Sequence, residues 1–241
     1  MEENRIVLIT GAKGGLGSFV TEAFLAAGDI VIGTSKSIQA SDFSNPRFVA
    51  MASDLTDPAS TSHLVDCVME RFRRIDVLVH VMGGFSGGKP IGETDDATWD
   101  RMMNLNLRSG FNILRAVIPP MRAAGSGRIV AIASRAAAEP AANIAAYGAS
   151  KAGLVSLIKS AALENKDRGI TVNAVLPGGM NTDANRKADP AADSSRWVPP
   201  ENVADLVVFL SSDAASQITG AAIPVYGKGG LTWWWNCLWG R

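Results

Sequence analysis

Tyr147 and Lys151 lie four positions apart in the segment AAYGASKAGL, residues 145–154. On a helix, this spacing places two side chains on one face, one turn apart. A phenol is a poor base at neutral pH, but a neighbouring ammonium favours the phenolate and lowers the phenol pKa. The pair therefore predicts a general acid/base in which Lys151 brings Tyr147 towards its working range. The same spacing also occurs on many exposed helix surfaces, so the pair alone does not establish chemistry.

Ser134 ends the apolar segment RIVAIAS, which reads as a strand preceding the helix of Tyr147. In parallel α/β sheets, ligands bind beyond the carboxyl ends of the strands. We therefore expect Ser134 and Tyr147 to converge at that edge, beside a bound nucleotide.

A glycine-rich segment, TGAKGGLG at 10–17, follows the first predicted strand and precedes a helix. Glycine permits a tight turn and lets backbone N–H groups approach a phosphate, and the helix N-terminus adds its positive dipole end. In this position the pattern favours dinucleotide binding over a merely structural turn. The expected contacts from this loop are Gly11, Lys13, Gly15, Leu16 and Gly17.

The end of the second predicted strand, IVIGTSKS at 30–37, offers hydroxyls and one cation but no acid. A carboxylate there would select NAD by accepting hydrogen bonds from the adenosine ribose. Ser35 and Lys36, with Lys13 from the glycine loop, instead favour NADP(H) over NAD(H). The alternative is that both lysines are simply solvated.

Asp54 and Leu55 follow the third predicted strand, in the segment SDLTD. Asp54 is in a position to accept a hydrogen bond from the adenine amino group. It could equally belong to the N-cap region of the next helix.

The candidate site residues can meet only if their strands end at one edge of a sheet. The sequence predicts such a sheet, because short apolar strands alternate with helices along the chain. Apolar runs predict strands at 5–10, 30–34, 47–52, 77–81, 128–133, 171–176 and 222–225. Longer periodic segments predict helices at about 15–27, 58–73, 97–121, 146–165 and 200–211. The alternation predicts one α/β domain over residues 1–241, a doubly wound Rossmann-type fold with a seven-stranded parallel sheet and helices on both faces.

Two segments stand apart from this alternation. Residues 179–199 are polar and weakly periodic, as expected of a substrate loop or lid. The tail at 231–241 holds four of the six tryptophans, and tryptophan is enriched at interfaces. A subunit contact is the first interpretation of the tail, and a cover over a neighbouring active site is the second.

Composition excludes several classes of protein. Lysine plus arginine and aspartate plus glutamate both number 23, so a nucleic-acid partner is not expected. The cysteines, Cys67 and Cys237, are far apart, and the histidines are only His63 and His80, so we expect neither a disulfide framework nor a metal site. The acidic N-terminus is unlike a signal peptide, and no apolar run approaches a membrane span. We expect a cytoplasmic protein without membrane contact.

Taken together, the motifs of this chain resemble those of the short-chain dehydrogenase/reductase family, over nearly the whole chain. They are TGAKGGLG at 10–17, NLRSG at 106–110, Ser134, Tyr147 with Lys151, and PGGMNT at 177–182. The layout is most similar to 3-oxoacyl-carrier-protein reductases. The resemblance implies an NADP(H)-dependent oxidoreductase that transfers a hydride between nicotinamide and a carbonyl or alcohol substrate, with 3-oxoacyl thioesters as one candidate.

The resemblance also implies a role for each residue. Tyr147 would protonate the substrate carbonyl oxygen, and Ser134 would position that oxygen. Lys151 would hold the nicotinamide ribose and lower the tyrosine pKa, while Asn106 would help to hold a water that links Lys151 to solvent. The nicotinamide would be lined by Pro177, Gly178, Met180 and Thr182.

The resemblance further implies a homotetramer or homodimer, built partly from the helices at 97–121 and 146–165. Two alternatives stay open. One is a reductase of a pterin-like or other cyclic carbonyl or imine substrate, because GGFSGGKP at 83–90 is weakly similar to dihydropteridine reductases. The other is a non-catalytic, nucleotide-sensing member of the family, which the presence of Ser134, Tyr147 and Lys151 argues against.

The chain departs from the family pattern in two places. After the fourth strand the family usually has Asn-Asn-Ala-Gly, whereas this chain has HVMGG at 80–84. We expect His80 to be a hydrogen-bonded core residue, Gly83 to approach the adenosine ribose, and Phe85 to form an apolar wall of the substrate entrance. Near the C-terminus Tyr226 stands where the family often has an acid, and we interpret it as a packing residue.

Overall fold

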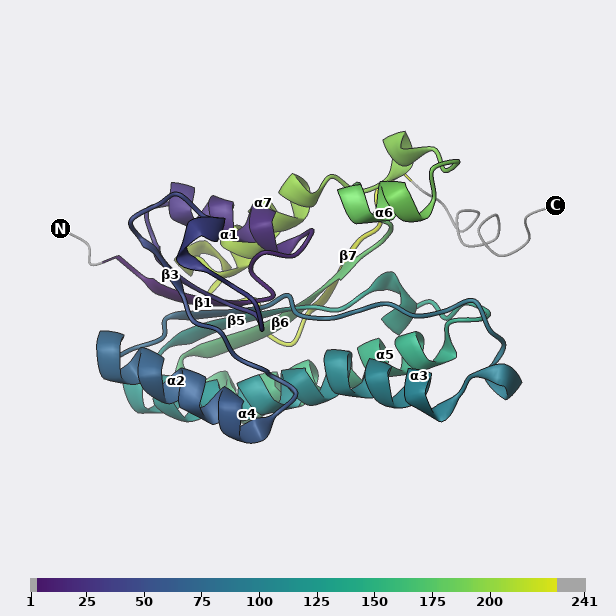
Figure 1. Ribbon diagram of the computed structural model, residues 1–241. Coiled ribbons are helices and arrows are strands. Elements are labelled where there is room, and N and C mark those ends of the chain that lie inside the picture. The colour runs from purple at the N-terminus through teal and green to yellow at the C-terminus, as the bar shows by residue number, and fades with distance from the viewer. Residues whose placement is uncertain (1–3, 229–241) are drawn as a thin grey trace.

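Seven short apolar segments form one parallel sheet in the computed structural model, which describes residues 4–228 (Figure 1). The strands are β1 (Ile6–Thr10), β2 (Ile30–Thr34), β3 (Phe48–Ala50), β4 (Val77–His80), β5 (Gly127–Ile132), β6 (Ile170–Pro177) and β7 (Ala222–Val225). Their order is β3-β2-β1-β4-β5-β6-β7, so the direction of winding changes between β1 and β4. This order confirms the predicted fold class and puts the ligand edge beside the carboxyl ends of β1 and β4.

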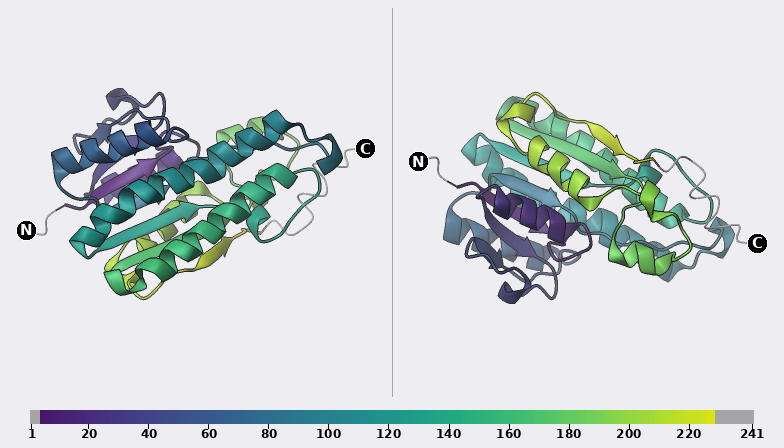
Figure 2. Two further views of the ribbon diagram at one scale, coloured as in Figure 1. Left: turned by 90° about the horizontal axis from the view of Figure 1, so that it is seen from below. Right: turned by 90° about the horizontal axis from the view of Figure 1, so that it is seen from above.

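Helices cover both faces of the sheet (Figure 2). One face carries α1 (Gly17–Ala26) and α7 (Pro200–Leu210), which pack on each other. The other face carries α2 (Pro58–Phe72), α4 (Ser109–Ala124) and α5 (Ala145–Asn165). Short helical turns lie at Ala40–Asp42, Ile91–Glu93, Arg135–Ala137, Lys166–Arg168, Ser194–Arg196 and Asp213–Ala215.

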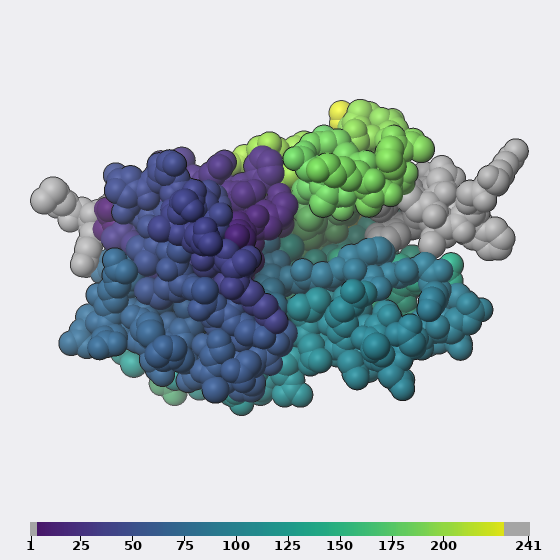
Figure 3. Space-filling view, in the orientation of Figure 1, coloured from purple at the N-terminus to yellow at the C-terminus, as the bar shows by residue number. Residues whose placement is uncertain are grey.

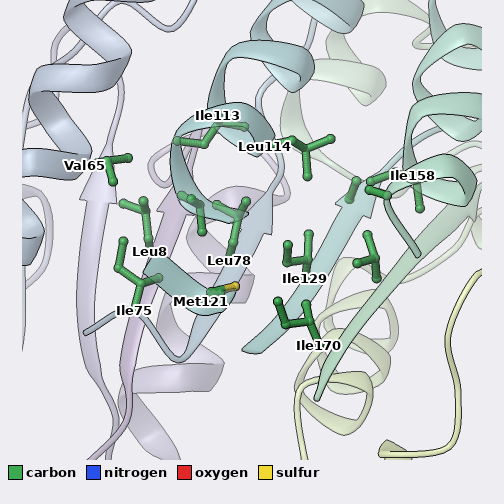
Figure 4. Close-up of a cluster of buried hydrophobic side chains, with 14 of the residues drawn as sticks. Leu8, Val65, Ile75, Leu78, Ile113, Leu114, Met121, Ile129, Ile158 and Ile170 are labelled. Atoms are coloured by element: carbon green, nitrogen blue, oxygen red, sulfur yellow. The ribbon is translucent and has the colours of Figure 1, made fainter. Parts of the chain in front are cut away.

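Alternate side chains of the strands point into two separate hydrophobic cores, one on each face of the sheet. Leu8 points to the core under α2, α4 and α5, whereas Ile9 points to the core under α1 and α7. Figure 4 shows the first of these cores, where Leu8, Leu78 and Ile129 meet side chains from the helices. Burial on both faces explains why the strands read as continuous apolar runs.

The predicted helix at 97–121 is not uniform. It consists of α3 (Asp96–Met102), a π-helical segment (Met103–Arg108) and α4, which continues past Pro119 and Pro120 to Ala124. A π-helical turn accommodates an additional residue and is often found at functional sites. Here it contains Asn106, whose amide bonds to a neighbouring loop and so supports the widened turn.

The segment at 179–199 is more ordered than its weak periodicity predicted. It contains α6 (Asp183–Ala188), which begins after the N-cap residue Thr182, and it closes on itself through a parallel bridge between Met180 and Val198. In the space-filling view the green surface of α6 projects over the teal surface near α3, and a recess separates them (Figure 3). The predicted tail at 231–241 and Cys237 lie outside the described residues.

None of the helices within residues 4–228 is long and apolar enough to cross a membrane. The same part of the chain contains no group of three or more His, Cys, Asp or Glu side chains that could hold a metal ion.

Candidate active site

The carboxyl ends of β1, β4, β5 and β6 meet at one edge of the sheet, and most of the predicted site residues lie there. The glycine loop follows β1, Ser134 follows β5 and Tyr147 belongs to the first turn of α5. This shared edge is the one at which doubly wound sheets bind their ligands.

The Ser134 hydroxyl and the Tyr147 phenol lie close enough to influence each other, as their predicted convergence requires. Ser134 is buried and its Oγ also accepts a bond from the backbone N–H of Ala136 at 3.2 Å. Burial raises the pKa of Tyr147, and the neighbouring Ser134 hydroxyl acts in the opposite direction. The direction is the reverse of the one expected from Lys151, because desolvation of the phenolate outweighs the other influences.

Lys151 is buried beneath the same edge, and its Nζ donates to the carbonyl of Ile132 at 2.9 Å. Burial lowers the pKa of this ammonium to about 8. Gly83 lies directly against it, since a Cβ at this position would be 3.0 Å from Nζ. The predicted contact Gly83 therefore adjoins Lys151 and leaves room for no larger residue.

Asn106 joins the π-helical segment to the loop after β4. Its Nδ2 donates to the Gly84 carbonyl and to Ser150 Oγ, each at 3.0 Å, and its Oδ1 accepts from the Gly84 N–H at 2.9 Å. Ser150 in turn donates to the Tyr147 carbonyl at 2.7 Å. Protein groups therefore take up the amide hydrogens of Asn106, and the fully buried Ser150 links it to the tyrosine.

Sequence reasoning missed Ser150. Its position one residue before Lys151, on the inner side of α5, was the available signal, but its partner on another helix could not be read from spacing.

His80 is a buried residue, as expected, and it bonds to Thr10. The Thr10 Oγ1 lies 2.9 Å from His80 Nδ1 and accepts from the N–H groups of Val81 and Met82 at 3.1 Å each. The hydroxyl proton of Thr10 is therefore available to Nδ1, which places the imidazole proton on Nε2. Burial lowers the pKa of His80 to about 3, and the Lys151 charge acts in the same direction.

The glycine loop turns as tightly as its composition predicted. Gly11 has a φ of 68°, and a Cβ at Gly17 would lie 1.9 Å from the Gly11 carbonyl oxygen. Gly15 faces the segment 179–199, where its Cβ would contact Thr182 at 3.4 Å. Leu16, by contrast, points its side chain into the core, so only its backbone can serve a ligand.

The two candidate phosphate-binding cations are both paired with carboxylates. Lys13 Nζ lies 3.2 Å from Asp42 Oδ2 and also donates to the Ser37 carbonyl, and Lys36 Nζ lies 2.7 Å from Asp54 Oδ2. Neither lysine is simply solvated. The predicted contact Ser35 has a buried hydroxyl for which the described residues provide no hydrogen-bond partner.

Asp54 is not the cap of the following helix. Asp57 caps α2, while Asp54 accepts from the N–H and hydroxyl of Thr56 as well as from Lys36. These bonds hold the pKa of Asp54 below its usual value, with Lys36 as the largest cause. Leu55 is buried in the core, so its backbone alone can take part in binding.

The residues predicted to line the nicotinamide follow β6. Pro177 ends the strand, and Gly178 donates to the Val225 carbonyl at 2.9 Å in a position where a Cβ would meet the backbone of Tyr226. Met180 starts the bridge that closes the next segment. Thr182 is buried beside Gly15, so this segment and the glycine loop are in contact.

The opposite side of the site is partly apolar. The Phe85 ring meets the Tyr147 ring edge-on with centroids 5.0 Å apart, and Phe85 is 58% exposed. A small cavity of about 70 Å³ adjoins this region. Its lining residues are Ser86, Gly87, Lys89, Thr94, Thr98, Asn143, Ile144, Ala145 and Ala146.

Tyr226 packs as expected. The guanidinium of the buried Arg135 stacks 4.8 Å from its ring centroid, and the same side chain donates to Glu139 at 2.7 Å. This contact connects the segment after Ser134 to the end of β7.

A doubly wound parallel sheet with a glycine loop after its first strand is the architecture of dinucleotide-binding α/β proteins. The family model for short chain dehydrogenase matches residues 5–193. The chain therefore belongs to the short-chain dehydrogenase/reductase family, and it is an oxidoreductase.

Individual relatives agree with this assignment. The 3-oxoacyl-[acyl-carrier-protein] reductase FabG of Salmonella typhimurium is 35% identical over 237 residues, covering 93% of this chain and 97% of that protein. The short chain dehydrogenase adrF of Penicillium roqueforti is 33% identical, covering 91% and 94%. Among solved structures, gox2181 superposes with a TM-score of 0.87 at 30% identity, covering 96% and 97% of the chains. ElxO with NADP bound superposes with a TM-score of 0.88 at 26% identity, covering 93% and 98%.

Proposed function

We propose that this chain is an NADP(H)-dependent reductase or dehydrogenase acting on a carbonyl or alcohol substrate. The observation that supports this most directly is the convergence of Ser134, Tyr147 and Lys151 at the sheet edge that also holds the glycine loop. When bound, the nicotinamide supplies or accepts the hydride.

In the reducing direction, Tyr147 donates its phenolic proton to the substrate carbonyl oxygen while Ser134 donates a hydrogen bond to that oxygen. Burial raises the pKa of Tyr147, which keeps it protonated at neutral pH as a proton donor must be. An amine with a pKa of about 8 both gains and loses protons near neutral pH, so Lys151 is suited to return a proton to the tyrosinate. Asn106 and Ser150 hold the first turn of α5 in place.

The residues at the nucleotide end of the site are suited to a dinucleotide that carries a 2′-phosphate. The closely packed glycines present backbone rather than side chains to a ligand. Lys13, Lys36 and the buried hydroxyl of Ser35 surround the end of β2, where the 2′-phosphate of NADP(H) would be held. The NADP-bound relative ElxO supports the same choice.

For the substrate, we favour a 3-oxoacyl thioester, because a relative at 35% identity is a 3-oxoacyl-[acyl-carrier-protein] reductase. The exposed ring of Phe85 beside Tyr147 offers an apolar surface for an acyl chain. NADPH oxidation measured with acyl thioester, quinone, pterin, sugar and steroid carbonyls would rank the classes. Faster turnover of a cyclic carbonyl than of the thioester would contradict this choice.

The two tyrosines of the chain provide a matched test of the mechanism. Tyr147→Phe should lower the rate of NADPH-dependent carbonyl reduction by a factor of about 10²–10⁴, because it removes the general acid. Tyr226→Phe retains the ring that Arg135 contacts and should keep nearly full activity. NADPH binding, followed by fluorescence, should survive in both variants. Undiminished reduction by Tyr147→Phe would show that another group supplies the proton.

We also propose that the chain forms a homodimer or homotetramer through the outer sides of α4 and α5. Two large apolar side chains lie exposed there, Phe111 on α4 and Leu163 on α5. The outer side of α5 also carries the small residues Ala149, Ala152 and Ser156, which allow another helix to approach closely.

A further inference from the structure

A carboxylate lies at the nucleotide end of the site although the end of β2 has none. Asp42 belongs to the short helical turn Ala40–Asp42, and its Oδ2 lies 3.2 Å from Lys13 Nζ. The same oxygen accepts from the Gln39 N–H at 2.8 Å, and Lys13 also donates to the Ser37 carbonyl. The segment after β2 therefore folds back onto the glycine loop and brings an acid to the predicted phosphate-binding cation.

We propose that Asp42 is a specificity-determining residue that weakens the preference for NADP(H) over NAD(H), by competing with the 2′-phosphate for Lys13. The proposal rests on the proposed function in one respect, that a dinucleotide binds at this edge. A 2′-phosphate that reaches Lys13 must share it with the carboxylate or displace it, and like charges repel. NAD(H) has a hydroxyl at that position, from which a carboxylate can accept a hydrogen bond.

Burial distinguishes this ion pair from its neighbour. The side chains of Lys13 and Asp42 are 34% and 26% exposed, whereas those of Lys36 and Asp54 are 62% and 36% exposed. Water and salt screen the second pair more strongly. Lys13 is also held in place, by Asp42 and by the Ser37 carbonyl, whereas Lys36 extends from the end of the strand. A change at Asp42 should therefore alter nucleotide binding more than a change at Asp54.

The test is the affinity of the whole protein for NADPH and NADH, measured by isothermal titration on the wild type and on Asp42→Asn. Asparagine retains a side-chain oxygen for the Gln39 N–H but carries no charge, so the turn is preserved. We expect NADPH to bind about three to five times more tightly to the variant, within the range that a partly screened ion pair supports. NADH should bind no more tightly than before.

A second pair of variants tests whether Asp42 acts through Lys13. In Lys13→Met, the further change Asp42→Asn should alter the NADPH dissociation constant by less than about twofold, because the cation for which the two anions compete is absent. Titration with 2′,5′-ADP and 5′-AMP should reproduce the difference without the nicotinamide half of the molecule.

Two results would overturn the inference: an unchanged ratio of the two affinities, whether both stay the same or both rise equally, or a full effect of Asp42→Asn without Lys13. Failure of the wild type to bind either dinucleotide would overturn the proposed cofactor, and the inference with it. Binding with an unmoved ratio would overturn the inference alone and leave the proposed function intact.

Discussion

His80 is an imidazole held neutral in the core at the end of β4. Its pKa is lowered from 6.5 to about 3 by burial, so the unfolded chain takes up a proton below about pH 6.5 while the folded chain does not. Stability should therefore be lost as the pH falls from about 6.5 towards 3, at about 1.4 kcal/mol per pH unit from this residue. Urea unfolding followed by circular dichroism at several pH values measures this slope.

Other groups also titrate in that range, so the informative quantity is the difference between the wild type and His80→Asn. Asparagine can still accept from Thr10 but cannot be protonated, and the variant should show a shallower loss of stability below pH 6.5. Its stability at pH 7 can differ in either direction without affecting the comparison. Parallel slopes for the two proteins would mean that His80 is protonated in the folded state.

At the scale of elements, the turn from β1 into α1 depends on one glycine more than on the others. A Cβ at Gly17 would lie 1.9 Å from the Gly11 carbonyl oxygen, and the neighbouring atoms are backbone that cannot rotate away. Gly17→Ala should therefore lower the free energy of unfolding by about 1–3 kcal/mol, because the loop and the first turn of α1 must separate. Nucleotide affinity should fall with it, since the same backbone is expected to approach the phosphates. Urea unfolding and NADPH titration measure the two effects.

Gly15→Ala is the matched control for that change. Its added methyl group would meet only the Thr182 side chain, at the ordinary contact distance of 3.4 Å, so the free energy of unfolding should change by less than about 0.5 kcal/mol. If both alanine variants were equally destabilised, general loss of glycine flexibility would explain the effect better than the contact with Gly11.

The elements themselves were largely predictable from sequence, because strands buried on both faces, such as Val77–His80, read as continuous apolar runs. The π-helical segment was not, since its widening depends on bonds from Asn106 to a loop 22 residues away in sequence. For the site, the edge on which Ser134, Tyr147 and Lys151 meet followed from the rule for strand ends.

Contacts between distant segments and degrees of burial could not be predicted in the same way. The contact between Asp42 and Lys13 depends on how the chain turns after β2, and the spacing of residues in the sequence does not indicate that turn. The pKa of Tyr147 moves opposite to the expectation because burial, which a helical spacing does not express, is its largest cause.

For the whole molecule, helices on both faces of the sheet leave a large apolar side chain exposed, and the most exposed of these lies on α5. Both faces bury a continuous core, yet α4 and α5 present Phe111 and Leu163 outward, with Leu163 72% exposed. Tyr147 and Lys151 belong to α5, and Asn106 lies in the segment that leads into α4. A subunit contact on these helices would therefore brace the elements that carry the candidate catalytic residues.

We expect the wild type to sediment as an oligomer and Leu163→Glu as a monomer in sedimentation velocity at micromolar concentration, because a charge within an apolar contact is costly to bury. Phe209→Glu tests whether any exposed apolar residue has the same effect, since Phe209 is 44% exposed on α7, on the opposite face of the sheet. That variant should remain at least dimeric. A monomeric wild type, or an unchanged mass for Leu163→Glu, would contradict assembly through α4 and α5. Loss of carbonyl reduction in the monomer, with NADPH affinity retained, would further indicate that the contact supports the arrangement of Tyr147 and Asn106.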